Sequence, residues 1–255
     1  MTTRLVLIHG AWAGPWVWNA VIEPLENAGI EPHAVTLPGV GHWAPEEEVE
    51  LGDLVSSVLD QIADLDGTLV LAGHSGGGIV ATQVAELIPD RIAGVAYVAG
   101  MMLPPGMSYR DLCAGLGFHQ PVGVGPYLEL TADGRGSVVP PEVAASIFFH
   151  LAEPESAITA ARRLVPQMDT ARSIAPTWTA ERFGRIPRLY IEALHDRSLP
   201  LDVQRRMQQL SPGAEVLALD SDHAPQLSRT AELAEMLASF AASVGSHSHR
   251  TGPRS

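Results

Sequence analysis

A serine enclosed by glycines is the part of this sequence that points most directly to chemistry. The segment Gly73-His74-Ser75-Gly76-Gly77 follows the apolar run 68–72 and precedes a stretch typical of a helix. Between a strand and a helix, this spacing predicts a tight turn that strains the serine backbone and exposes its hydroxyl. The Gly76 N–H and the dipole of the helix are then expected to stabilise an oxyanion. The pattern therefore predicts nucleophilic attack by Ser75 on a carbonyl carbon.

His223 is the histidine best placed to activate this serine. A serine hydroxyl is a weak nucleophile at neutral pH and needs a base. His223 follows the last predicted strand and precedes the closing helix, in a loop at the carboxyl edge of the sheet, where such folds place their sites. His9 ends the first strand and His74 adjoins the nucleophile, and we interpret both as structural.

Asp196 is the carboxylate expected to orient His223 through its Nδ1 proton. It follows the run 188–193, and the 27 residues from position 196 to position 223 leave room for one helix and one strand. Both side chains should then meet at the same edge of the sheet. The other carboxylates of this region, which we interpret as solvated or capping groups, are Glu192, Asp202, Asp220 and Asp222.

The loop after the first predicted strand should supply the second oxyanion donor. Its sequence is His9-Gly10-Ala11-Trp12, and a backbone N–H suffices whatever the side chain. We expect the Ala11 N–H to fill this role, with that of Trp12 as the alternative. The apolar side chains predicted to bind substrate are Trp12, Met101, Phe118, Phe148 and Trp178.

The elements that must position these residues alternate between apolar runs and helical stretches. This order is typical of an α/β fold whose mainly parallel sheet is covered by helices on both faces. The first four strands are apolar enough to be buried on both sides. The six predicted strands are 4–9, 32–37, 68–72, 92–99, 188–193 and 215–219. The helices expected in the core are 16–28, 51–63, 79–87, 202–210 and 231–242.

A segment rich in proline interrupts this alternation and is predicted to form a cap. It spans residues 103–186 and carries two helical stretches, 141–151 and 155–164. The core would then comprise residues 1–102 and 187–244, followed by a flexible tail, 245–255. The aromatic residues expected to be buried between the cap and the carboxyl edge of the sheet are Phe118, Tyr127, Phe148, Phe149 and Trp178.

Composition excludes several classes of protein. The 255 residues are 46% hydrophobic, enough for a globular core, which excludes disordered and fibrous classes. A formal charge of −13, from 16 basic and 29 acidic residues, argues against nucleic acid and anionic membranes as partners. Cys113 is the single cysteine, so no disulfide within the chain is expected. No signal peptide and no apolar stretch long enough to span a membrane are recognised in the sequence. We therefore expect a cytoplasmic protein that needs no metal or cofactor and acts on a small molecule; a homodimer is left open.

The segments LVLIHGAWAGPWVW, LAGHSGGG, PRLYIEALHD and SDHAPQL together resemble the α/β-hydrolase fold. Within that superfamily the chain is most similar to small methylesterases and hydroxynitrile lyases. The stretch IPRLYIEALHDRSLPLDVQRRMQ resembles bacterial pyrethroid-hydrolysing carboxylesterases. The resemblance implies a catalytic triad of Ser75, His223 and Asp196.

The resemblance also discriminates between reactions. The lyases of this group carry a threonine where this chain has Gly10 and a lysine where it has Ala224, and all 16 basic residues here are arginines. The resemblance thus implies a cofactor-independent serine hydrolase that cleaves carboxylic esters of a small to medium hydrophobic substrate through an acyl-enzyme. Two alternatives stay open: a biosynthetic tailoring thioesterase or cyclase, and a non-hydrolytic small-molecule binder on the same fold.

Overall fold

Six strands form one parallel sheet at the centre of the molecule. The computed structural model describes residues 3–44, 46–118 and 120–247. The strands lie in the order β2-β1-β3-β4-β8-β9, and every neighbouring pair is parallel. Their bounds are β1 Thr3–Ile8, β2 Ile30–Val35, β3 Leu69–His74, β4 Ile92–Val98, β8 Arg188–Ala193 and β9 Ala214–Leu219. The predicted six strands and mainly parallel sheet are confirmed.

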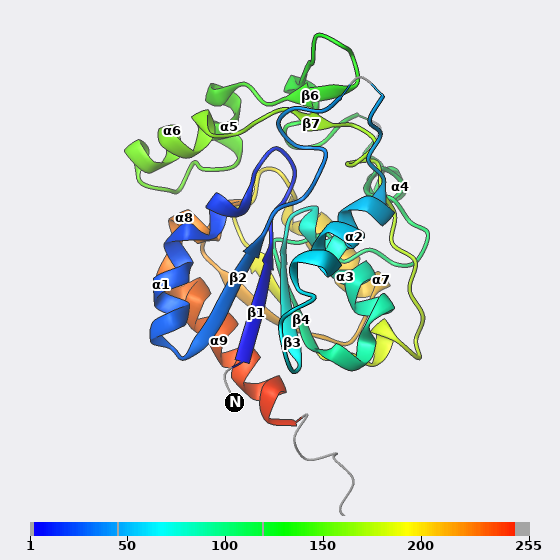
Figure 1. The fold of residues 1–255 in the computed structure, drawn as a ribbon. Coiled ribbons are helices and arrows are strands. Elements are labelled where there is room, and N and C mark those ends of the chain that lie inside the picture. Colours follow the sequence, from blue (N-terminus) through cyan, green and yellow to red (C-terminus); the bar gives the residue numbers. More distant parts are fainter. Residues whose placement is uncertain (1–2, 45, 119, 248–255) are drawn as a thin grey trace, which may run out of the picture.

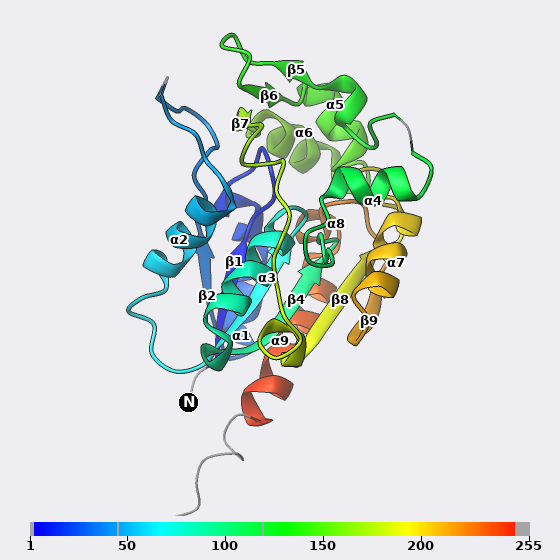
Figure 2. The ribbon, with the colours of Figure 1, turned by 90° about the vertical axis from the view of Figure 1, so that its right-hand side faces the viewer.

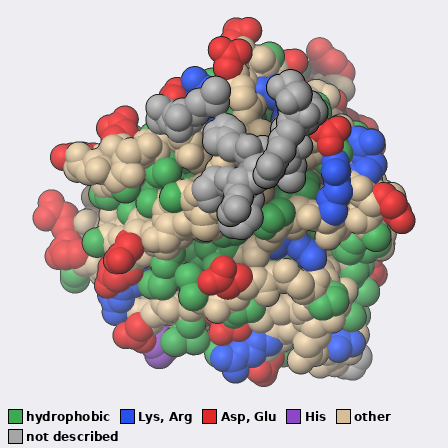
Figure 3. Space-filling view, turned by 90° about the horizontal axis from the view of Figure 1, so that it is seen from below, with side chains coloured by type: hydrophobic (Ala, Val, Ile, Leu, Met, Phe, Trp, Pro, Cys, Tyr) green, Lys and Arg blue, Asp and Glu red, His purple; other side chains and the backbone are tan. Residues whose placement is uncertain are grey.

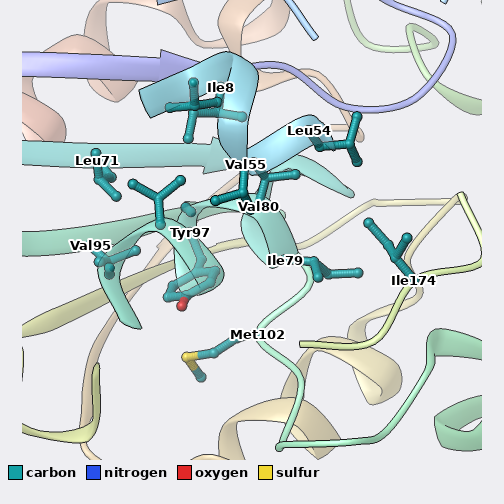
Figure 4. Packing of buried hydrophobic residues seen from close by; sticks show 14 of the residues in the cluster. Ile8, Leu54, Val55, Leu71, Ile79, Val80, Val95, Tyr97, Met102 and Ile174 are labelled. Carbon is teal, nitrogen blue, oxygen red and sulfur yellow. The ribbon is translucent and has the colours of Figure 1, made fainter. Parts of the chain in front are cut away.

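Helices cover both faces of this sheet (Figure 1). Because strand side chains alternate between faces, Leu5 and Leu7 pack on one face and Val6 and Ile8 on the other. The first face packs against α1 Asn19–Asn27 and α9 Thr230–His247. The second packs against α2 Leu51–Gln61, α3 Gly77–Leu87 and α7 Leu201–Leu210, and Figure 4 shows part of this cluster. The predicted α/β class is therefore confirmed.

Some boundaries differ from those predicted. The segment 16–28 is divided into a 3-10 helix, η1 Pro15–Trp18, and α1, and another short helix, η2 Pro89–Arg91, precedes β4. The last helix continues through His247, so the predicted tail does not begin at residue 245; residues 248–255 lie outside the described part. Strand β2 forms one edge of the sheet and is only partly buried, contrary to the expectation of burial on both sides.

The strand order places β1 and β3 side by side, which brings their carboxyl ends together. The connection from β1 leads outward to β2, whereas the connection from β2 returns past β1 to β3. Open α/β sheets bind ligands where such connections diverge. The loops that carry Ala11 and Ser75 both start at this point.

Most of the segment 103–186 lies above the carboxyl ends of the strands, but its last part, residues 177–186, runs down beside α3 to the start of β8 (Figures 1 and 2). The two predicted helices are present but shorter. Two features were not predicted: the helix α4 and a small antiparallel sheet of order β5-β6-β7. The elements are α4 Tyr109–Gly115, η3 Gly125–Tyr127, β5 Glu129–Leu130, β6 Gly136–Val138, α5 Pro141–Ile147, α6 Pro154–Arg162, β7 Gln167–Met168 and η4 Phe183–Arg185.

The prediction that all five cap aromatics are buried is wrong in part. Phe148 and Phe149 are buried in an apolar cluster that also contains Trp12 of the core. Tyr127 and Phe118, in contrast, are 55% and 38% exposed, because short elements give the outer cap little apolar surface against which to pack. Burial in the cap is therefore concentrated on the side that faces the core.

The face opposite the cap carries charged and apolar side chains together where its residues are described (Figure 3). Figure 3 shows acidic and basic side chains scattered among apolar ones across this face. No helix among the described residues is long and apolar enough to cross a membrane.

Candidate active site

Ser75 occupies a sharp turn between β3 and α3. Its φ of 52° lies in the left-handed region, which is strained for a residue with a side chain. The loop after β4 holds this turn: the Ser75 N–H donates to the Val98 carbonyl at 3.3 Å, and the Met101 N–H donates to the Ser75 carbonyl at 2.8 Å. A Cβ on Gly73 would lie 2.6 Å from the Gly77 carbonyl oxygen, so only glycine fits before the turn.

His223 and Asp196 form a buried hydrogen-bonded pair. The Nδ1 atom of His223 lies 2.7 Å from Oδ2 of Asp196, and the side chains are 5% and 0% exposed. The other carboxylate oxygen accepts the N–H groups of Ser198 and Leu199 at 2.7 and 2.8 Å. With its proton on Nδ1, His223 keeps Nε2 free as a base.

His74 links this pair to the nucleophile turn. Its Nε2–H donates to the main-chain carbonyl of His223 at 2.8 Å, and the ring centroids of the two histidines are 4.9 Å apart. Burial, together with the neighbouring His223, lowers the pKa of His74 to about 3. His74 is therefore a neutral hydrogen-bond donor that holds the loop of His223 beside Ser75.

His9 holds the loop after β1 in a similar way. Its two ring nitrogens pair with the Gly10 carbonyl at 2.8 Å and with the Leu37 N–H at 3.2 Å. Nε2 must accept from the N–H of Leu37, so Nδ1 carries the proton that is donated to Gly10. Burial lowers the pKa of His9 to about 4, which agrees with this neutral ring.

Two backbone N–H groups near Ser75 are available to an oxyanion. Among the described residues, the N–H groups of Ala11 and Gly76 donate to no other group, and both residues are partly accessible. The two loops meet closely, since a Cβ on Gly10 would lie 2.7 Å from the Ser75 Cβ. The Trp12 N–H, our alternative donor, is already bonded to the side-chain oxygen of Gln167 at 3.2 Å.

Asp222 adjoins the base but faces away from it. It is fully buried, not solvated, and its carboxylate accepts the N–H groups of Leu151 at 2.7 Å and Ala224 at 3.2 Å and the Ser228 hydroxyl at 2.8 Å. It caps the turn after His223 and ties that turn to the cap.

Among the described residues, none of the other three carboxylates is hydrogen-bonded to the base. Asp220 is exposed and pairs with His195 and Arg229, and Asp202 lies in the first turn of α7. Glu192 is buried beside the Arg205 side chain, which corrects the expectation that it is solvated.

Of the apolar residues expected to bind substrate, Phe148 packs directly against the base. Its ring stacks on that of His223 at a centroid distance of 5.2 Å and lies 6.3 Å from the ring of Trp12. Met101 adjoins the nucleophile turn through its backbone.

The other two expected residues lie elsewhere. Trp178 packs edge-on against Phe183 and donates to the Leu103 carbonyl, within the core cluster on the α3 side and not in the cluster around Phe148. Phe118 is partly exposed. The binding roles of both stay predictions, and the position of Trp178 argues against its role.

Gln167 is a residue at this site that the sequence did not reveal. It belongs to β7 of the cap, is 5% exposed, and uses both ends of its amide, accepting from Trp12 and donating to the Gly39 carbonyl at 2.9 Å. No local pattern connects positions 155 residues apart. The described residues contain no group of three or more His, Cys, Asp or Glu side chains that could hold a metal ion.

Comparison with known proteins shows the family of this chain. Residues 5–236 match the model of the alpha/beta hydrolase family. The chain is 32% identical to a pyrethroid hydrolase of Sphingobium wenxiniae, covering 94% of this chain and 88% of that protein. It is 30% identical to Methylesterase 7 of Arabidopsis thaliana, covering 93% of this chain and 96% of that protein. The crystal structure of a pyrethroid hydrolase from Sphingobium faniae superposes with a TM-score of 0.80 at 30% identity, over 94% of this chain and 98% of that one.

Proposed function

The chain belongs to the alpha/beta hydrolase family, and from this premise we propose that it is a serine hydrolase of carboxylic esters. Ser75 is the nucleophile, His223 the base, and Asp196 the group that orients the base. The observation that carries this proposal is the buried 2.7 Å contact between His223 Nδ1 and Asp196 Oδ2, tied by His74 to the strained turn of Ser75.

In the first half-reaction, Ser75 Oγ attacks the ester carbonyl carbon while its proton passes to Nε2 of His223. Asp196 stabilises the imidazolium that forms. The C–O bond to the alcohol then breaks, and the departing oxygen takes the proton from Nε2. The acyl group stays on Ser75 as an ester.

In the second half-reaction, water replaces the alcohol. His223 removes a proton from the water, whose oxygen attacks the acyl carbon, and the same proton then returns to Ser75 Oγ as the acid leaves. In both steps the carbonyl oxygen becomes negative. The N–H groups of Ala11 and Gly76 stabilise it, each contributing about 3 kcal/mol in sites of this kind.

The surroundings favour an uncharged, apolar substrate of small to medium size. Phe148 and Trp12 flank the catalytic groups, and the cap cluster around them is composed of apolar side chains. The relatives named above act, by their names, on pyrethroids and methyl esters. An ester with a hydrophobic acyl or alcohol group fits both observations.

Cyanohydrin cleavage, the reaction of the lyases that this chain resembles, lacks support. Those enzymes use a lysine after the catalytic histidine, and this chain has Ala224, which is buried in the apolar cap cluster. A threonine in place of Gly10 would place a Cβ 2.7 Å from that of Ser75. Both positions favour hydrolysis.

The decisive test combines covalent labelling with turnover of p-nitrophenyl, methyl and bulky aromatic esters. A fluorophosphonate should modify Ser75 alone, and Ser75→Ala should abolish turnover without changing the circular dichroism spectrum, because alanine fits the turn and only the hydroxyl is lost. Labelling of another serine together with an active Ser75→Ala variant would refute the proposal. Release of no more than one alcohol per protein would indicate a binder, and faster turnover of matched thioesters would indicate a thioesterase.

A further inference from the structure

We propose that Gln167 of the cap is a positioning residue for the oxyanion hole, which fixes the loop after β1 so that the Ala11 N–H points at the substrate carbonyl. This inference rests on the function proposed above. Gln167 acts through Trp12, with which it shares a hydrogen bond, and needs no contact with the substrate.

Trp12 has a backbone conformation that requires external support. Its φ of 58° is left-handed, a region that a bulky side chain seldom occupies. The cap bonds each of its polar groups: the N–H donates to Gln167 Oε1 at 3.2 Å, the carbonyl accepts from Val165 N–H at 2.9 Å, and the indole N–H donates to the Ser137 carbonyl at 3.1 Å. The cap therefore determines the shape of this catalytic loop.

The Gln167 amide is itself fixed in orientation. Its oxygen faces the N–H of Trp12 and its nitrogen faces the carbonyl of Gly39. A flipped amide would set its NH2 group against the N–H of Trp12 and its oxygen against the carbonyl of Gly39, and both bonds would be lost. The backbone reinforces this placement, because the Met168 N–H also donates to Gly39 at 2.8 Å and Val40 bridges to Gln167. The side chain thus joins the cap, the loop after β2 and the loop after β1.

The two peptide groups around Ala11 are held from opposite sides. The carbonyl of Gly10 accepts from His9, in the buried interior. In a trans peptide the N–H points away from the carbonyl, so the N–H of Ala11 points away from His9. The next N–H, that of Trp12, is bonded to Gln167. The Ala11 N–H, which has no partner among the described residues, therefore depends on both neighbours for its direction.

Removing the Gln167 amide should therefore weaken binding of the transition state more than binding of the substrate. With Gln167→Leu we expect kcat to fall about 30-fold with KM changed less than threefold, which is less than the 100-fold or more lost when an oxyanion donor is deleted. Affinity for a trifluoromethyl ketone, which adds to Ser75 and forms an oxyanion, should fall by a similar factor.

Gln167→Glu separates positioning from support of the fold. Its carboxyl oxygen still accepts from Trp12, but an ionised carboxylate cannot donate to Gly39. We expect a lower Tm but a fall in kcat of less than tenfold, smaller than in Gln167→Leu, because the bond to Trp12 is kept. If Gln167 only stabilised the cap, its variants would lose activity in proportion to their loss of stability. A fall in kcat of more than tenfold in folded Gln167→Glu would overturn the proposal, even if Gln167→Leu did not fold.

Gln83→Leu is the matched control. Gln83 on α3 also bonds the returning cap segment to the core, since its side-chain oxygen accepts from the Thr177 N–H at 2.8 Å. Among the described residues it makes no hydrogen bond to the loop after β1. This variant should keep kcat and ketone affinity within twofold. Wild-type kcat in folded Gln167→Leu, or an equal loss in Gln83→Leu, would refute the role of Gln167. A wild type without ester turnover would instead refute the proposed function.

Discussion

The Nε2–H of His74 donates to the main-chain carbonyl of His223, and this single bond connects the turn of the nucleophile to the loop of the base. The two rings lie 4.9 Å apart, and a protonated His74 would repel the imidazolium that forms on His223 during catalysis. Burial, which lowers the pKa of His74 to about 3, keeps that ring neutral. The Nδ1 atom of His74 has no partner among the described residues, so the ring contributes a donor and no charge.

Neutral buried histidines should make the protein sensitive to acid. The native pKa values of His74 and His9 are lowered to about 3 and 4, from 6.5 for an ordinary histidine. Below pH 6.5 the unfolded chain therefore binds protons that the native state does not, and stability falls as the pH falls towards 4. Between pH 6.5 and pH 5, each of the two histidines should lower the free energy of unfolding by about 2 kcal/mol.

Urea unfolding at pH 7, 6 and 5 measures this loss directly. His74→Gln keeps an N–H donor for the carbonyl of His223 but cannot titrate, so the slope of stability against pH should be about half that of wild type. Equal slopes for the two proteins would show that the pKa of His74 does not differ between the native and unfolded states.

Phe148 should control the size of the accepted substrate. Its ring covers that of His223, and Phe148→Ala would open a cavity beside the catalytic groups. We expect a loss of about 3 kcal/mol in stability and a shift of kcat/KM towards bulkier acyl chains in a series of p-nitrophenyl esters.

Phe149→Ala is the control for this change. Phe149 is equally buried and packs edge-on against Phe148 at 5.8 Å, but it does not stack on His223. It should lose comparable stability without the shift in chain-length preference. Identical preferences in the two variants would show that Phe148 acts only in packing.

Chelators should leave ester turnover unchanged. The proposed steps move protons only among Ser75, His223, water and the leaving groups, and backbone N–H groups balance the charge on the oxyanion. We expect full activity after dialysis against EDTA. Activity that is lost on chelation and restored by a divalent ion would require a different mechanism.

The core was predictable from the sequence because its signals are local. The central strands β1, β3 and β4 contain apolar runs, and the turn around Ser75 is marked by glycines whose Cβ atoms would collide with backbone. Asp196 and His223 follow from the rule that parallel strands end at a common edge.

The contacts between the cap and the loops of the core were not predictable, because the residues that make them lie far apart in the chain. Gln167 belongs to a strand of two residues, and its partners Trp12 and Gly39 lie on other loops. The burial of Asp222 likewise depends on a hydrogen bond with Leu151 in the cap. Short elements whose partners lie far away in the chain leave no periodic hydrophobic pattern in the sequence from which they could be predicted.

Replacing Asp196 or Asp222 by asparagine should have opposite consequences, although both carboxylates are buried. In Asp196, the oxygen that faces Ser198 and Leu199 accepts two N–H groups. An asparagine must keep its carbonyl oxygen there, so its NH2 group is turned towards Nδ1 of His223. The imidazole then carries its proton on Nε2 and cannot act as a base, which costs about 10⁴ in kcat in serine proteases. We expect a loss of that order for Asp196→Asn, with stability little changed.

Asp222→Asn should instead weaken the fold. Both oxygens of Asp222 accept from donors, one from Leu151 and the other from Ala224 and Ser228, so the new NH2 group must face an N–H group from which it cannot accept. We expect a loss of about 1 to 3 kcal/mol in unfolding free energy and less than a tenfold loss in kcat. Urea unfolding and steady-state kinetics on the two purified variants separate the effects. A larger loss of kcat in Asp222→Asn would move the acid to Asp222, whereas near-normal kcat in both would leave His223 to act without a carboxylate.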